Sequence, residues 1–173
     1  MPPPAVNPAR PKIQFSLIEC IAIGFGAGAV GVAVMTLGEK VEQVFTKRPN
    51  SYVPGKTLAA LLGAAGLTSS SERLFASNPD RINHIMHWGQ GIAAAGLRGL
   101  MAYNGLVGPF GSFMFMCVRL MIDQTLENWT GVGALPWTWP VNEQIIDLLH
   151  KGVFAAVTGY VADRLILGTA LNA

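Results

Sequence analysis

The chain has 173 residues, of which 51% are hydrophobic and only 13% carry a charged side chain, whereas an ordinary soluble domain has about 25% charged residues. This composition indicates an integral membrane protein, and the length fits a single domain. The formal net charge of +2 is small and its charges are scattered, which argues against nucleic-acid binding.

The chain begins with a Pro-rich segment, and we expect residues 1–14 to form an extended tail and residues 15–173 to form one transmembrane domain. An apolar run follows from Ile13 to Leu37, with Glu19 as its one charged residue. This run is longer than the roughly 7 to 15 residues of a signal-peptide core. We therefore interpret it as a retained membrane anchor.

Three further segments are long enough to cross a bilayer, although polar residues interrupt each of them; they are 84–107, 109–128 and 142–167. Because about 20 residues can cross the hydrocarbon layer of roughly 30 Å, the sequence predicts an all-α, integral membrane four-helix bundle. The long first loop contains the apolar piece TLAALLGAAGL. That piece is too short to span, so we expect a short interfacial or re-entrant helix.

Four crossings place the long first loop and the Trp-rich loop at 129–140 on the same side of the membrane. Several ionisable residues then meet near that side, and their spacing of three or four places each set on one helix face. Since ionisable groups are costly against lipid, these faces are expected to line an internal polar pocket. We predict that the catalytic residues are Glu39, His87, Asp123, Glu127, Asp147 and His150, and that the substrate-binding residues are Glu42, His84, Arg98, Arg119, Trp88 and Tyr103.

Two kinds of chemistry fit such a pocket. Carboxylate and imidazole ligands three residues apart build di-iron sites in some helix bundles, but only the Asp147/His150 pair approaches the usual Glu-x-x-His pattern. We therefore predict neither a metal nor another cofactor. Crowded carboxylates cannot all ionise, so one can act as an acid while a neighbour acts as a base.

A purely structural interpretation stays open beside the catalytic one. Arg119 with Asp123, and Asp163 with Arg164, are candidate ion pairs that would only fix helix packing. The tryptophans suit an interfacial belt at least as well as a substrate site.

Several strings between Met35 and Arg164 carry a resemblance to known families: MTLGEKVEQ, RPNSYVP, HWG, DQTLEN, PWTWP and DLLHKGVF. With these strings the chain resembles a family of small four-helix membrane proteins of bacteria and fungi, which implies the fold. It is also similar to the small membrane proteins of fungal polyketide pathways that hydrolyse or cyclise polyepoxides, as in aurovertin-type and citreoviridin-type biosynthesis. The second resemblance implies epoxide opening and supplies no catalytic motif that matches residue by residue.

These observations predict a membrane-embedded, cofactor-independent acid–base enzyme acting on a lipophilic small molecule, most concretely an epoxide hydrolase or cyclase of secondary metabolism. The alternatives are a small proton-linked transporter, because buried carboxylates can relay protons, and an accessory membrane subunit. The expected partners are a lipophilic substrate and the bilayer, without nucleic acid, and a homo-oligomer is left open. We expect a multi-pass protein of the endoplasmic reticulum membrane in a eukaryote or of the plasma membrane in a bacterium. The lysines and arginines of the first loop favour a cytoplasmic pocket mouth.

Overall fold

The computed structural model describes residues 13–168, and within this range the chain is helical and contains no strand. The predicted all-α class is confirmed, whereas most of the predicted tail lies outside the described residues. The elements are α1 (Leu17–Thr46), α2 (Val53–Ala64), α3 (Ser71–Ser77), α4 (Pro79–Tyr103), α5 (Gly108–Trp129), the 3₁₀ helix η1 (Pro136–Thr138) and α6 (Val141–Leu167).

The four long helices α1, α4, α5 and α6 coincide in position with the four predicted spans. Among the described residues only α1 and α6 are both long and apolar enough to cross a membrane. Helices α4 and α5 do not meet the criterion because polar side chains interrupt their apolar residues. The structure therefore supports two candidate spans, and a crossing by α4 and α5 belongs to the proposal below.

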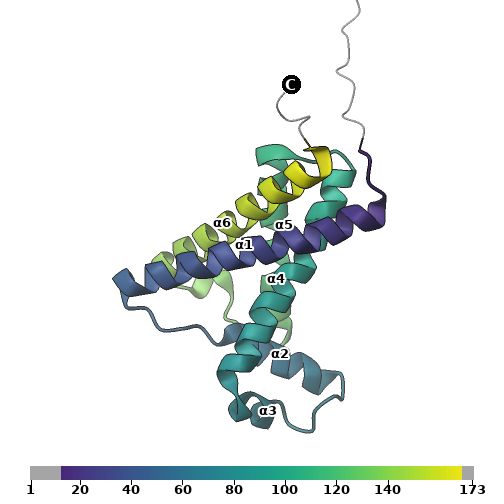
Figure 1. The fold of residues 1–173 in the computed structure, drawn as a ribbon. Helices are drawn as coiled ribbons and strands as arrows, with labels where there is room; N and C mark the ends of the chain where they lie inside the picture. The colour runs from purple at the N-terminus through teal and green to yellow at the C-terminus, as the bar shows by residue number, and fades with distance from the viewer. Residues whose placement is uncertain (1–12, 169–173) are drawn as a thin grey trace, which may run out of the picture.

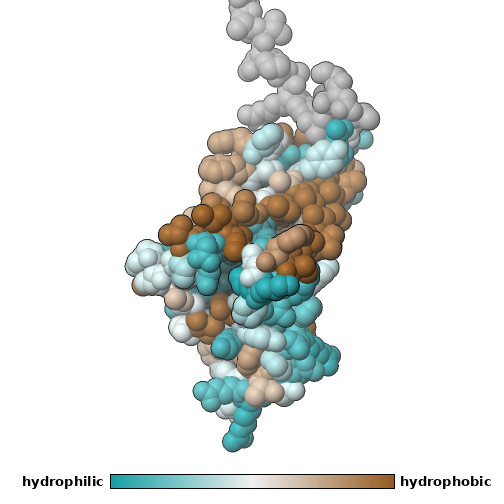
Figure 2. Space-filling view, turned by 90° about the vertical axis from the view of Figure 1, so that its left-hand side faces the viewer, coloured by the Kyte–Doolittle hydropathy of each residue, from teal (hydrophilic) through white to brown (hydrophobic). Residues whose placement is uncertain are grey.

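The four long helices pack against one another at different angles. Helices α1 and α6 lie side by side and cross α4, and α5 packs against α6 (Figure 1). Both ends of the described chain lie at one end of the bundle, while α2 and α3 lie at the other (Figure 1). On the face shown in Figure 2, hydrophobic side chains gather over the long helices and hydrophilic side chains dominate the end that carries α2 and α3.

Helix α1 has clear boundaries at both ends. Its one early charge, Glu19, forms a capping box with Ser16, accepting hydrogen bonds from the Ser16 backbone N–H at 2.7 Å and from its hydroxyl at 2.8 Å. Beyond the apolar run, α1 continues through polar residues and ends at Thr46. Its C-cap is Lys47, which has a left-handed φ of 59°. This extension carries the polar end of α1 past the apolar part of the bundle.

The long first loop differs from the prediction of one short helix. It contains two helices, α2 and α3, and α2 begins at Val53, before the apolar piece. Pro54 explains the earlier start, because proline fits the first turn of a helix, where its missing N–H is not needed.

Close contact between α1 and α4 depends on glycine. A methyl group at Gly24 would lie 2.5 Å from the carbonyl oxygen of Ala95, and Gly99 of α4 faces the backbone of Cys20 on α1. The neighbouring Gly26 faces open space. Glycine at the contact positions lets the two backbones approach, as in the small-residue interfaces of membrane helices.

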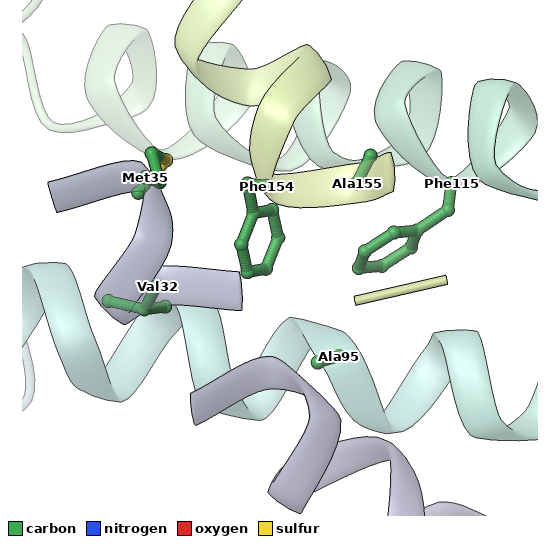
Figure 3. Close-up of a cluster of buried hydrophobic side chains, with 6 residues drawn as sticks. All are labelled: Val32, Met35, Ala95, Phe115, Phe154 and Ala155. Atoms are coloured by element: carbon green, nitrogen blue, oxygen red, sulfur yellow. The ribbon is translucent and has the colours of Figure 1, made fainter. Parts of the chain in front are cut away.

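The central apolar core contains side chains from all four long helices. Phe115 of α5 and Phe154 of α6 are fully buried, and their ring centroids lie 5.6 Å apart. Figure 3 shows the core side chains, which are Val32, Met35, Ala95, Phe115, Phe154 and Ala155.

This packing gives a paired prediction for thermal stability in detergent. We expect Gly24→Ala to lower stability by about 1–3 kcal/mol, because the added methyl overpacks the α1–α4 contact. Gly26→Ala is the matched control, and it should leave stability unchanged or raise it by up to ~1 kcal/mol, since alanine favours the helix. Thermal unfolding followed by circular dichroism measures both, and equal stability of the two variants would contradict the predicted contact.

Candidate functional site

A cavity of about 560 Å³ opens at the end of the bundle that carries α2 and the Trp-rich loop. Its walls come from the polar ends of α1, α4, α5 and α6 and from residues 48–54 and 132–140. All the residues predicted to be catalytic line this cavity, together with three of those predicted to bind substrate: Glu39, His87, Asp123, Glu127, Asp147, His150, His84, Trp88 and Arg119.

The most buried group of the cavity is the carboxylate of Asp123 on α5. It forms an ion pair with Arg119 one helical turn earlier, and its other oxygen lies 3.3 Å from Lys151 Nζ on α6. Gln90 of α4 donates a further hydrogen bond to it at 2.6 Å. Lys151 also contacts both oxygens of Asp147, at 2.7 and 2.8 Å, so that one lysine joins two carboxylates. Cations of α5 and α6 thus compensate the charge of Asp123, and an amide of α4 adds a hydrogen bond.

Glu127, one turn beyond Asp123, is in a different situation. Its side chain is half-buried, and across residues 13–168 the structure assigns its carboxylate no hydrogen bond and no ion pair. Its carboxyl group can therefore give or accept a proton without breaking an ion pair.

His87 supplies a second group suited to proton transfer. Its Nε2 lies 3.1 Å from the Thr36 hydroxyl on α1. Glu39, one turn after Thr36, lies within electrostatic range of the imidazole and accepts a hydrogen bond from Gln43 at 3.2 Å. An imidazole in this position can act as a base that takes a proton from water or from a bound hydroxyl group.

Residues 48–54 close one side of the cavity and are held by side-chain hydrogen bonds. Lys40 donates to Asn50 at 2.7 Å, and Asn83 donates to the carbonyl of Ser51 at 3.0 Å. Tyr52 donates to Asp80 at 2.7 Å, and this hydrogen bond raises the pKa of the Tyr52 phenol. The segment connects the ends of α1 and α4 across the mouth of the cavity.

Three of the residues predicted to bind substrate do not line the cavity. Glu42 lies next to it but forms an ion pair with Arg48 at 2.9 Å. Tyr103 ends α4 at the opposite end of the bundle. Arg98 follows His87 by eleven residues, roughly 16 Å along α4, and this distance removes it from the site.

Arg98 belongs to a separate buried ion pair. It is fully buried and donates to Asp163 at 2.7 Å and to the carbonyl of Leu106 at 3.2 Å. The same oxygen of Asp163 accepts the backbone N–H of Gly108 at 2.7 Å. Asp163 is therefore paired with Arg98, where the sequence suggested Arg164, and the pair fixes the α4–α5 turn to α6.

The sequence prediction missed several residues of the cavity, above all Lys151 and Gln90. Lys151 follows Asp147 by one helical turn, a spacing that marks an ion pair on a helix surface. Gln90 follows His87 by three residues and so shares its helix face. Nothing in the linear sequence indicates that Lys151 also reaches Asp123 on another helix.

The His, Cys, Asp and Glu side chains were also compared with the arrangement that a metal site requires. Within residues 13–168 no group of three or more His, Cys, Asp or Glu side chains has an arrangement that could hold a metal ion.

Comparisons with models of protein families, with curated proteins and with solved structures gave no match to this chain. The resemblance to small membrane proteins of bacteria and fungi stays a prediction, as does the epoxide chemistry that it implies.

The Arg98–Asp163 pair predicts a structural effect without a direct effect on the cavity. We expect Arg98→Met to lower the stability by about 3–5 kcal/mol, because it leaves a carboxylate buried without its partner. The double variant Arg98→Met/Asp163→Leu should recover part of that loss. Thermal unfolding in detergent tests both variants, and a single variant as stable as the wild type would contradict the role of the pair.

Proposed function

We propose that the protein is a membrane-embedded, cofactor-independent acid–base enzyme that acts on a lipophilic small molecule, with epoxide hydrolysis or cyclisation as its reaction. The observation that carries this proposal is the contrast between two neighbouring carboxylates in one cavity. Asp123 is held by Arg119, Lys151 and Gln90, whereas the structure assigns Glu127 no such partner among the described residues. An acid–base site needs one group that moves a proton beside others that stay fixed.

The roles follow from these surroundings. Glu127 is the acid that protonates the epoxide oxygen as the carbon–oxygen bond breaks. His87 is the base that takes a proton from water or from a hydroxyl of the substrate as the new carbon–oxygen bond forms. Arg119 lines the cavity and supports the negative charge that develops on the leaving oxygen. Water adds to give a diol in hydrolysis, and an internal hydroxyl gives a cyclic ether in cyclisation.

The walls of the cavity suit an apolar substrate. Met35, Trp88, Val132, Trp139 and Ile146 line it beside the charged groups. A mostly apolar pocket with a few polar groups is the usual form of a small-molecule site. A membrane location, with α4 and α5 as further spans, would supply such a substrate from the bilayer.

The proton-linked carrier is the second candidate, because a second ionic group, Arg98 with Asp163, lies toward the opposite end of the bundle. A carrier would have to connect that end to the cavity. Along α5 and α6 the fully buried Phe115 and Phe154 lie between the two ionic groups, since Phe115 precedes Arg119 by one turn and Phe154 follows Lys151 by three residues. This apolar layer favours an enzyme with a pocket that is open at one end.

Glu127→Gln and His87→Gln should each lower turnover about 100-fold, since each removes one proton-transfer group. The measurement is diol formation from stilbene oxide by the purified protein in detergent. Glu72→Gln, an exposed change on α3 outside the cavity, is the control and should keep full activity. Absence of diol formation above the rate with heat-denatured protein, together with uptake into sealed vesicles, would favour the carrier.

The proposed four crossings predict where the termini and the cavity mouth lie. In a eukaryotic host we expect glycan-acceptor tags on both termini to be modified and Asn128, which begins the acceptor sequence NWT, to stay unmodified. Gel mobility before and after glycosidase treatment measures this. Unmodified termini, together with a glycan on an acceptor inserted near Ser70, would place the mouth on the lumenal side.

A further inference from the structure

We infer that the ligand of this cavity carries a protonated amine on an apolar body. The inference rests on the proposed function only in taking the same cavity as the binding site, and it concerns what binds there rather than the reaction. It starts from the charges that the side chains of the cavity leave uncompensated.

The cavity contains more acidic than basic side chains, although the whole chain has a net charge of +2. Six carboxylates face four lysine and arginine side chains in its lining. They are Glu39, Asp80, Asp123, Glu127, Glu143 and Asp147 against Lys40, Arg48, Arg119 and Lys151.

The pairing of these groups sharpens the imbalance. Lys151 contacts two carboxylates, Arg119 contacts Asp123, and Arg48 hydrogen-bonds to Glu42. The remaining cation, Lys40, is exposed and donates to two amide oxygens, at 3.1 and 2.7 Å. Each basic group of the lining therefore already has an oxygen partner.

One half-buried carboxylate, Glu39, has no such compensation, because it accepts only an amide hydrogen bond from Gln43. Glu127 has no direct partner within residues 13–168, but Lys151 and Arg119 lie within electrostatic range of it, and the proposed reaction uses its protonated form. Arg48 lies within electrostatic range of Glu39, but its hydrogen bonds go to Glu42. Because burying an unpaired charge is costly, a ligand that brings a positive charge gains most here, and an anionic ligand would be repelled.

The aromatic side chains of the lining suit the same ligand. The indole N–H of Trp139 donates to the carbonyl of Ala134 at 2.9 Å, and the Tyr52 hydroxyl donates to Asp80. Both rings line the cavity, as does Trp88. Aromatic faces attract ammonium groups and also pack against apolar chains.

Arg119 supplies a second, independent indication of a ligand. It is more than nine-tenths buried and lines the cavity, and its Nη1 contacts Asp123, whereas its Nε and Nη2 form no hydrogen bond with the described residues. Its charge is balanced by Asp123, so the remaining N–H donors suit a neutral oxygen. An ether, hydroxyl or epoxide oxygen of the ligand would satisfy them.

Matched amphiphiles test the inference. The purified protein in a neutral detergent is titrated with dodecylamine, dodecanol and dodecanoate at pH 7, and tryptophan fluorescence reports binding because Trp88 and Trp139 line the cavity. We expect the amine to bind at least tenfold more tightly than the alcohol, and the carboxylate to bind most weakly. Equal affinities, tighter binding of the carboxylate or alcohol, or no binding of the amine would overturn the inference.

Variants separate the cavity from partition into the micelle. Glu39→Gln should weaken the binding of dodecylamine about tenfold and leave dodecanol unaffected, whereas Glu72→Gln should bind like the wild type. Circular dichroism confirms that each variant is folded. Selective amine binding without diol formation would reject the proposed reaction alone, and diol formation without amine selectivity would reject this inference alone.

Discussion

The contact of Lys151 with two carboxylates is the interaction on which the site depends. Asp123 lies deep between the helices, where a lone carboxylate would be unstable, and Lys151 and Arg119 compensate it from α6 and α5. Since Lys151 also contacts Asp147, its single charge is shared. The sharing commits the buried positive charge to two carboxylates and leaves Glu127 without a direct cation contact, so its carboxyl group is able to exchange a proton.

The ionic groups lie on two sides of an apolar layer. The group on one side stabilises the fold, and the group on the other side lines the cavity. The Arg98–Asp163 pair is buried, accepts the Gly108 N–H, and fixes the α4–α5 turn. Phe115 and Phe154 lie between this pair and the cavity along α5 and α6. A buried pair of this kind serves geometry, because opening it would leave two charges without partners. The cavity, by contrast, contains groups that are only half-buried and in part unpaired.

The sequence was sufficient for the all-α class and the positions of the four long helices, because long segments bounded by turn residues, with polar residues three or four apart, indicate helices. The six residues predicted to be catalytic line one cavity in the structure. Their convergence could be predicted because the direction of each helix determines which helix ends lie together. The pairing of Arg98 could not be predicted, because the partner of a buried charge depends on how helices rotate against each other. The second loop helix was missed for a similar reason, as α3 is short and has no buried residue of its own.

The two ends of the bundle differ in how readily they can move, and this difference bears on access to the cavity. At one end, α1 and α4 are in backbone contact through Gly24 and Gly99, so separating them would open the core itself. At the other end, residues 48–54 are held by a few side-chain hydrogen bonds, most of them partly exposed to solvent. Solvent replaces exposed hydrogen bonds at little net cost, whereas packed backbone contacts have no substitute. The mouth of the cavity can therefore change shape at a lower cost than the long helices that position Asp123 and Glu127.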